Sequence, residues 1–291
     1  MQKPTPEDID AVCGLVNDLC GIYWDASKSY LIESRLSQIA ERSGCSNYHE
    51  LVRKVRTELA PGLKDQVVDA VTTNETLWFR DNSPYEALKF KIIPELIDAK
   101  AKGLFPRKFR IWSAACSTGQ EPYSIAMVLA DLIPDYTKWD IQILGTDISP
   151  AAVQTASYGA YRNLEISRGM DPARLAKYFD SHENGYRVKD EVRLMCSFKT
   201  RNLHLPMKDL GTFDVIFCRN VAIYFTNQDR RQLFSRLANA LNPNGWLFAG
   251  ASESLSDLGP EWRPQHHCHA IAYQPHGTTA PVAKPEYAIT H

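Results

Sequence analysis

The sequence lacks a surplus of charge of either sign, a long apolar run and a leader-like amino terminus. Its 33 lysines and arginines balance 34 acidic residues, giving a net charge of −1 over 291 residues, whereas nucleic-acid-binding domains usually carry a basic surplus. No apolar run approaches the roughly 18 to 20 residues that span a bilayer, and the start, MQKPTPEDID, has no apolar segment of the signal-peptide kind. We therefore expect a cytoplasmic protein with no nucleic-acid partner and no direct membrane insertion.

The cysteines are scattered along the sequence, which argues against a disulfide framework or a cysteine-rich zinc site. The seven cysteines include no C-x-x-C pair. The run His266-His267-Cys268-His269 gathers metal-ligating residue types, but neighbours on a strand point to opposite faces, so only His267 and His269 could face together. We predict a terminal strand there and no metal site.

The first 72 residues have the pattern of a helical domain without any strand. A capped helix is predicted from Thr5-Pro6-Glu7-Asp8, and further helices over about 27–43, from about Asn47 and around 67–71. Between Lys28 and Arg56, six basic residues stand against three acidic ones. This surplus indicates either an ordinary solvated helix face or a docking surface for an acidic partner.

From Ser83 onward, strand and helix patterns alternate, which is typical of a mostly parallel sheet with helices on both faces. Residues 73–108 are predicted to be a linker and a helix that opens with a capping box at Ser83-Pro84-Tyr85-Glu86. Strands are predicted at 109–112, 141–145, 213–218 and 246–249, and helices at 121–132, from Ser149-Pro150 and at 227–241. A period-two segment at 186–198, centred on Lys189-Asp190, predicts an inserted hairpin, and the tail at 274–291 is expected to be flexible.

Ligands of an open parallel sheet bind beyond the carboxyl ends of its strands, so the residues that follow each strand are candidates for a site. The turn at 113–119 after the first strand consists of small residues with one glycine, and is not the G-x-G-x-x-G of a dinucleotide site. Glu121 stands at the start of the next helix, where a pyrophosphate would require positive potential. We interpret this turn as a site for a ligand that carries a cation, although a plain acidic helix start would have the same pattern.

Polar residues follow the other strands as well. Asp147, after the second strand, can accept hydrogen bonds from both hydroxyls of a ribose. Arg219 and Asn220 follow the third strand, and Tyr224 is placed to close the site. In the linker, Arg80 could clamp a carboxylate with two hydrogen bonds. A nucleoside joined to a cationic amino acid is S-adenosylmethionine, which is the predicted cofactor.

These segments together, in their order and spacing over roughly residues 5 to 273, resemble the chemotaxis receptor methyltransferases, the CheR family. The matching segments are 72–76 with Phe79-Arg80, 113–124, 146–148, 202–203, 217–221 with 223–225, and 248–254. The resemblance implies the α/β fold of class I S-adenosylmethionine-dependent methyltransferases, which is Rossmann-like with a mostly parallel seven-stranded sheet. It also implies an all-α amino-terminal domain at 1–72 that docks on receptor helices, and a small inserted antiparallel β-subdomain at about 180–200 within a methyltransferase domain at 109–273.

The resemblance also implies a set of cofactor-binding residues, among which Asn202 could face adenine. The set is Asn74, Thr76, Arg80, Glu121, Asp147, Asn202, Leu203, Arg219 and Asn220. The implied substrate is a glutamate in the cytoplasmic helical domain of a chemoreceptor, and the products are a γ-methyl ester and S-adenosylhomocysteine. Such methylation serves adaptation in chemotaxis signalling, and we expect the enzyme to be a monomer.

The predicted reaction requires little acid–base chemistry. A glutamate carboxylate, with a pKa of about 4.3, is already ionised at pH 7, so its methylation needs no general base. Because a cation paired to that carboxylate would weaken it as a nucleophile, we expect Tyr224 or a backbone amide to position it.

Three other functions fit part of the pattern. One is a receptor-bound adaptor that holds S-adenosylmethionine or its product without catalysis, and another is a small-molecule methyltransferase, which would not need the helical domain. The third, a dinucleotide-dependent oxidoreductase, is disfavoured by the turn at 113–119.

Overall fold

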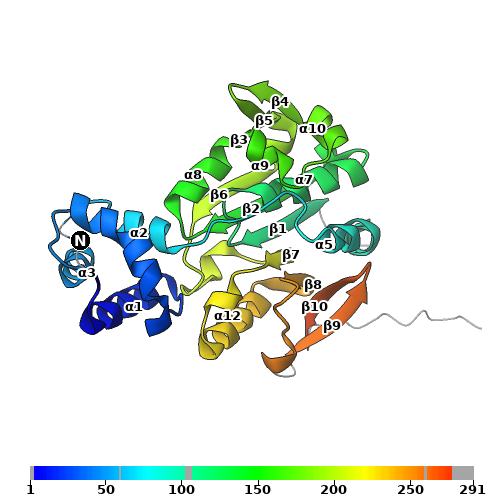
Figure 1. Ribbon diagram of the computed structural model, residues 1–291. Helices are drawn as coiled ribbons and strands as arrows, with labels where there is room; N and C mark the ends of the chain where they lie inside the picture. The colour runs from blue at the N-terminus through cyan, green and yellow to red at the C-terminus, as the bar shows by residue number, and fades with distance from the viewer. Residues whose placement is uncertain (1–2, 59, 102–106, 259–260, 277–291) are drawn as a thin grey trace, which may run out of the picture.

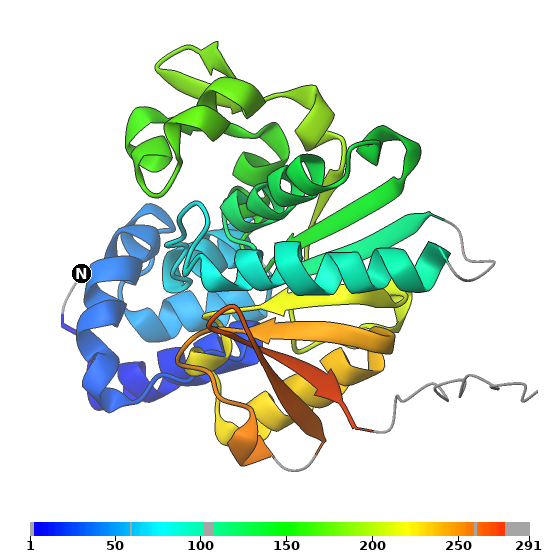
Figure 2. The same cartoon turned by 90° about the vertical axis from the view of Figure 1, so that its right-hand side faces the viewer.

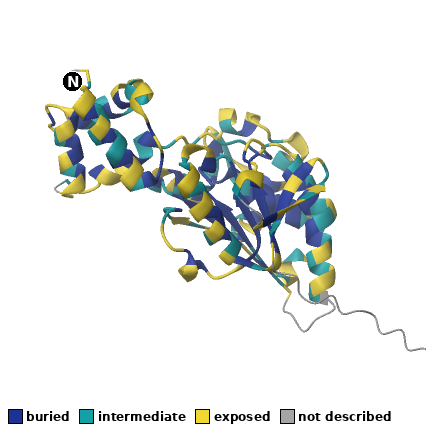
Figure 3. Ribbon diagram, turned by 90° about the horizontal axis from the view of Figure 1, so that it is seen from below, coloured by how far each residue is buried: buried dark blue, intermediate teal, exposed yellow. Residues whose placement is uncertain are grey.

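The computed structural model describes residues 3–58, 60–101, 107–258 and 261–276, which form an amino-terminal helical bundle beside a larger α/β domain (Figures 1 and 2). The bundle and the sheet each have a buried interior (Figure 3). Among the described helices, none combines the length and the apolar character needed to cross a membrane.

In the described residues, the bundle contains the four α-helices that the sequence predicts: α1 (Pro6–Cys20), α2 (Ser29–Arg42), α3 (Tyr48–Arg56) and α4 (Leu63–Val71). Apolar residues at helical spacing turn one face of each helix inward, where Val12, Ile32 and Leu51 are completely buried. The predicted cap is present, since the Thr5 hydroxyl accepts a hydrogen bond from the Asp8 N–H and the Asp8 carboxylate accepts one from the Thr5 N–H.

The α/β domain is built on a seven-stranded sheet with the order β6-β2-β1-β7-β8-β10-β9. Its strands are β1 (Lys108–Ala114), β2 (Asp140–Asp147), β6 (Cys196–Thr200), β7 (Phe213–Cys218), β8 (Leu241–Ala249), β9 (Trp262–His267) and β10 (Ala270–Pro275). The first five strands in this order are parallel, and β10 is antiparallel to both of its neighbours. The α/β class and the mostly parallel seven-stranded sheet are confirmed.

Helices cover both faces of this sheet. They are α5 (Ser83–Ala87), the π-helix η2 (Leu88–Ile92), α6 (Ile93–Ala101), α7 (Gln120–Leu132), α8 (Pro150–Tyr158) and α12 (Asn227–Asn239). Along β7, Val215 and Phe217 belong to the core that includes α7, whereas Ile216 and Cys218 belong to the core that includes α12. The near-continuous apolar run in β7 therefore reflects burial on both faces.

A second sheet of three short antiparallel strands has the order β3-β5-β4, with β3 (Ala160–Arg162), β4 (Phe179–His182) and β5 (Gly185–Val188). The helices α9 (Asn163–Ser167) and α10 (Pro172–Tyr178) lie in the connection between β3 and β4. The insertion predicted from the sequence is present, but it spans 160–188 rather than about 180–200.

The predicted hairpin at 186–198 is wrong. Lys189 precedes a short helix, α11 (Asp190–Arg193), and β6 pairs in parallel with β2 in the main sheet. The period-two pattern arises because β5 and β6 are both strands, but they belong to different sheets. The turn of α11 between them buries Val192 completely, which a hairpin turn would leave exposed.

A second local prediction is wrong, and a third is right only in part. The predicted capping box at Ser83 does not form, because the residue before α5 is Asn82, whose amide donates to Glu86 at 2.8 Å. The strand predicted at the histidine run is present as far as His267, where β9 ends, whereas Cys268 and His269 form the turn into β10. In the part of the chain that the structure describes, no three His, Cys, Asp or Glu side chains are grouped to hold a metal ion.

Candidate functional site

A pocket opens beyond the carboxyl ends of β1, β2, β6 and β7. It lies at the switch point of the sheet, because β2 and β6 follow on one side of β1, and β7 and β8 follow on the other. It contains about 880 Å³ of empty space, including solvent at its mouth. The structure brings all ten candidate residues to its lining: Asn74, Thr76, Arg80, Glu121, Asp147, Asn202, Leu203, Arg219, Asn220 and Tyr224. Segments far apart in the sequence therefore meet at one site, because parallel strands end at the same edge of the sheet.

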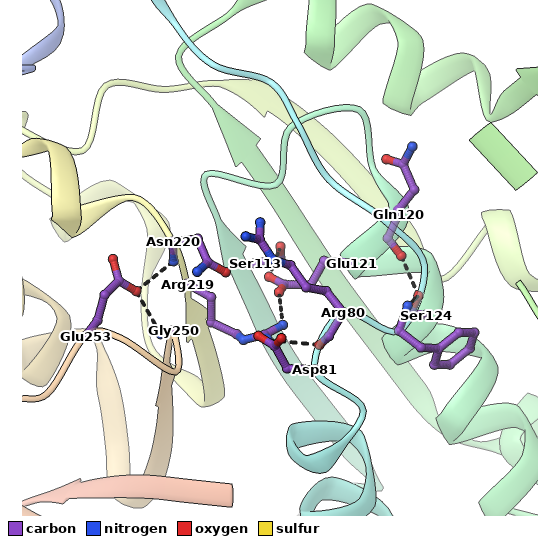
Figure 4. Close-up of polar contacts among 11 residues, drawn as sticks. Arg80, Asp81, Ser113, Gln120, Glu121, Ser124, Arg219, Asn220, Gly250 and Glu253 are labelled. Carbon is purple, nitrogen blue, oxygen red and sulfur yellow. Dashed lines mark hydrogen bonds and ion pairs between the residues drawn. The ribbon is translucent and has the colours of Figure 1, made fainter. Parts of the chain in front are cut away.

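Arg219 is the centre of a buried polar network in this pocket (Figure 4). Its side chain is 2% exposed, and its guanidinium forms ion pairs of 2.9 Å with Glu121 and 2.7 Å with Asp81. It also donates a hydrogen bond to the Arg80 carbonyl, while Ser113 donates to the second oxygen of Glu121. Burial acts to lower the pKa of Arg219, but the neighbouring carboxylates outweigh it and raise that pKa.

This network changes the interpretation of Glu121. From the sequence, its carboxylate is expected to be free to attract a cationic ligand, but in the structure its charge is compensated by Arg219. Glu121 still lines the pocket, so a ligand would meet an ion pair rather than an isolated anion.

Asp147 is the buried carboxylate of the pocket that has no cation beside it. It is 6% exposed and accepts backbone hydrogen bonds from Ser117 at 2.8 Å and Ser149 at 3.0 Å. It forms no ion pair with any residue that the structure describes. Burial raises the pKa of Asp147 above its ordinary 3.8. This carboxylate therefore keeps lone pairs for hydroxyl donors of a ligand.

The linker that follows α4 is fixed to both domains. Arg35 of α2 donates to the Thr72 carbonyl and to the Thr73 hydroxyl, both at 3.2 Å, and the Ser117 hydroxyl donates to the Asn74 carbonyl at 2.7 Å. The Arg80 guanidinium, in contrast, makes no hydrogen bond or ion pair with the described residues, although it lines the pocket. It is available to an anionic group such as a carboxylate.

Strained backbone is concentrated in the loops around this pocket. Ten non-glycine residues among those described have positive φ, and five lie in these loops: Phe79, Asp81, Ala115, Ser117 and Asn220. Such conformations persist only where surrounding contacts hold them, and they are common at functional sites.

The helical bundle reaches the pocket through the end of α1. The Asn202 amide donates to the Leu19 carbonyl at 2.8 Å and accepts from the His204 N–H at 2.8 Å, and the Tyr23 N–H donates to the Tyr224 carbonyl at 2.8 Å. Asn202, which the sequence places towards adenine, is thus also a bridge between the domains.

Two lining residues from this region, Cys20 and Ile22, escaped the sequence analysis. Their local pattern is that of an ordinary helix end, so it contains no signal of a ligand site. Burial raises the pKa of Cys20 to about 12 and also raises that of Cys116, which faces the pocket from the turn after β1. Both side chains are therefore neutral thiols rather than nucleophilic thiolates.

Comparison with known proteins agrees with this geometry. The family model described as "CheR methyltransferase, SAM binding domain" matches residues 74–269, and "CheR methyltransferase, all-alpha domain" matches residues 7–72. Chemotaxis protein methyltransferase 1 of Pseudomonas aeruginosa is 43% identical over 259 residues, covering 88% of this chain and 93% of its own. Chemotaxis protein methyltransferase Cher2 of Pseudomonas putida is 41% identical with the same coverage, and chemotaxis protein methyltransferase 1 of Vibrio cholerae is 40% identical, covering 84% and 88%. The resemblance inferred from the sequence and its cofactor, S-adenosylmethionine, are confirmed.

Proposed function

Because the chain belongs to the CheR methyltransferase family, we propose that it methylates glutamate side chains of chemoreceptors in the cytoplasm for adaptation in chemotaxis. The products are glutamate γ-methyl esters and S-adenosylhomocysteine. The observation that carries this proposal is the meeting of all ten candidate residues in one pocket between the helical bundle and the sheet.

The polar groups of the pocket fit an amino acid joined to a nucleoside. Asp147 offers acceptor sites for the two ribose hydroxyls, and Arg80, whose guanidinium has no partner among the described residues, offers donors for the carboxylate. Glu121, whose charge is partly compensated by Arg219, offers a carboxylate for the amino group. The Asn202 side-chain amide uses one N–H and one oxygen lone pair within the protein, so its second N–H and second lone pair are available to the adenine base. When bound, S-adenosylmethionine supplies a methyl group activated by a sulfonium.

The protein's contribution to the chemistry is orientation. The substrate carboxylate is ionised at neutral pH, and no histidine is among the described residues that line the pocket. The carboxylate oxygen attacks the methyl carbon in line with the bond that breaks, and opposite charges cancel as it does so. Holding the two groups in that geometry can contribute about 7–11 kcal/mol.

The test is transfer of a radiolabelled methyl group to cytoplasmic fragments of the host's chemoreceptors. We expect the label to be released as methanol by mild alkali, because carboxyl methyl esters hydrolyse in base. Receptor fragments with the modified glutamates changed to alanine serve as the control. Alkali-stable label would contradict the proposal, and cofactor binding without transfer would favour the adaptor.

The helical bundle does not by itself distinguish a receptor from a small-molecule substrate. Cys20 and Ile22 form part of the pocket wall, so removing residues 1–70 would disturb the cofactor site whatever the substrate is. Competition between receptor fragments and small carboxylic acids for the labelled methyl group is the more direct comparison.

Asp147→Asn should weaken S-adenosylhomocysteine binding about 10- to 100-fold, because hydrogen bonds to a charged acceptor are worth about 1.5–3 kcal/mol. The wild-type affinity should also fall as the pH drops through the raised pKa of Asp147, and the Asn variant should lack this dependence. Since that pKa is higher in the folded chain than in the unfolded chain, protonation of this group favours the folded state, so the loss is not unfolding. Calorimetry from neutral pH down to about pH 4, the ordinary range of an aspartate, measures both effects, and parallel pH profiles would refute the assignment.

Tyr224→Phe should lower turnover about tenfold if its hydroxyl orients the substrate carboxylate, while the affinity for S-adenosylhomocysteine stays within about twofold. Tyr224 is 36% exposed at the pocket, which suits a group that meets the incoming substrate. Steady-state turnover with receptor fragments measures the effect. Wild-type turnover in both Tyr224→Phe and Tyr224→Ala would remove Tyr224 from the mechanism.

A further inference from the structure

Glu253 is a buried carboxylate that receives four backbone hydrogen bonds. One oxygen accepts from the N–H groups of Asn220 at 2.6 Å and Gly250 at 2.7 Å, and the other from those of Val221 at 3.0 Å and Ile223 at 3.2 Å (Figure 4 shows the first two donors). The residue is 2% exposed. It therefore joins the loops that follow two neighbouring parallel strands, β7 and β8.

This arrangement requires an acceptor on both oxygens. Glu253 has no ion pair with any of the described residues, so the amide dipoles stabilise its charge. In Glu253→Gln, either orientation of the amide would place an NH₂ group against two N–H donors. At least two of the four hydrogen bonds would be lost, and the donors would be left buried.

The loop that Glu253 holds carries two residues of the pocket. Asn220 has a φ of 58°, in the left-handed region, and its side-chain oxygen is buried without a hydrogen-bond partner among the described residues. Tyr224 lies one turn further along the same loop. Such a conformation persists when contacts from outside the loop maintain it.

We propose that Glu253 is a positioning residue whose carboxylate holds residues 220–223 in the conformation that presents Asn220 and Tyr224 to the pocket. For its effect on turnover, this inference rests on the proposed function. Its effects on loop protection and cofactor-product binding can be measured without any receptor.

Hydrogen exchange of the Asn220, Val221 and Ile223 amides tests the proposal directly. In Glu253→Gln, these amides should exchange at least about tenfold faster than in the wild type, because their acceptor is lost. The Kd for S-adenosylhomocysteine should rise about tenfold, and turnover at saturating cofactor should fall by a further tenfold or so, because two pocket residues move. Glu253→Asp keeps two acceptor oxygens and should recover part of each loss.

Asp214→Asn is the matched control. Asp214 is a buried carboxylate at the other end of β7, where it accepts the Arg110 N–H at 2.9 Å, and it does not line the pocket. Its replacement should lower thermal stability but leave exchange of residues 220–223, the Kd and turnover of the folded protein unchanged.

Gly250→Ala should disturb the same contact between Glu253 and Asn220 without changing Glu253 itself. A Cβ at Gly250 would lie 2.5 Å from the Glu253 carboxylate and 2.9 Å from the Asn220 nitrogen, so it should reproduce the exchange and affinity changes. Unchanged exchange and Kd in folded Glu253→Gln would overturn the proposal, as would equal losses in Asp214→Asn. If exchange and Kd change as expected while the wild type methylates no receptor, the positioning role stands and the proposed function fails.

Discussion

Arg219→Met should lower the free energy of unfolding by about 3–5 kcal/mol, because removing one partner of a buried ion pair leaves an uncompensated charge. The Glu121 side chain is 13% exposed, whereas that of Asp81 is 43% exposed, so water screens the second pair and the first accounts for most of the effect. The same change should weaken S-adenosylhomocysteine binding at least about tenfold, since it releases both Glu121 and the Arg80 carbonyl. Urea denaturation and calorimetry measure the two effects.

Two variants separate the contributions within this network. Arg219→Lys keeps the charge but lacks the planar guanidinium that reaches three acceptors at once. Its losses of unfolding free energy and of affinity should therefore lie between those of the wild type and of Arg219→Met. Asp81→Asn removes only the exposed partner of Arg219 and should lower the free energy of unfolding by less than about 1 kcal/mol. An Arg219→Met protein with the wild-type urea midpoint and affinity would show that this network does not hold the pocket together.

Gly21→Ala should displace the end of α1 from the methyltransferase domain and weaken S-adenosylhomocysteine binding. Gly21 has a φ of 68°, where a Cβ costs about 1–2 kcal/mol, and that Cβ would overlap the His204 imidazole, adding about 1–3 kcal/mol of overpacking. Its neighbours Cys20 and Ile22 line the pocket, so their displacement should raise the Kd about tenfold. Calorimetry measures the affinity, and circular dichroism should show that the helices remain folded.

Gly62→Ala is the matched control for backbone strain. Gly62 has a φ of 76°, and no described residue outside its own local backbone comes within 4 Å of the position that a Cβ would take there. Its replacement should therefore lower the free energy of unfolding by about 1–2 kcal/mol and leave the Kd unchanged. Adding His204→Ala to Gly21→Ala should restore part of the affinity if the ring is the obstacle. Equal changes in Kd for Gly21→Ala and Gly62→Ala would contradict this account.

Local patterns in the sequence were enough to predict most elements of the fold. The bundle helices are visible in one stretch of chain because burial of one face imposes a period on consecutive residues. The strand Phe213–Cys218 is visible as a short apolar run because it is buried on both faces. Strand pairing is not local. Gly185–Val188 and Cys196–Thr200 have similar alternation, yet they pair in different sheets, and this is why the predicted hairpin was wrong.

The sequence by itself determined which residues after the strands reach the pocket, because a parallel sheet brings the carboxyl ends of its strands to one edge. Only the tertiary structure decided what those side chains bind within the protein. It pairs Glu121 with Arg219, joins Asn202 to α1 and places Glu253 under the loop of Asn220. These contacts join residues about 30 to 180 positions apart, and their distances depend on how whole elements pack, which no local periodicity encodes.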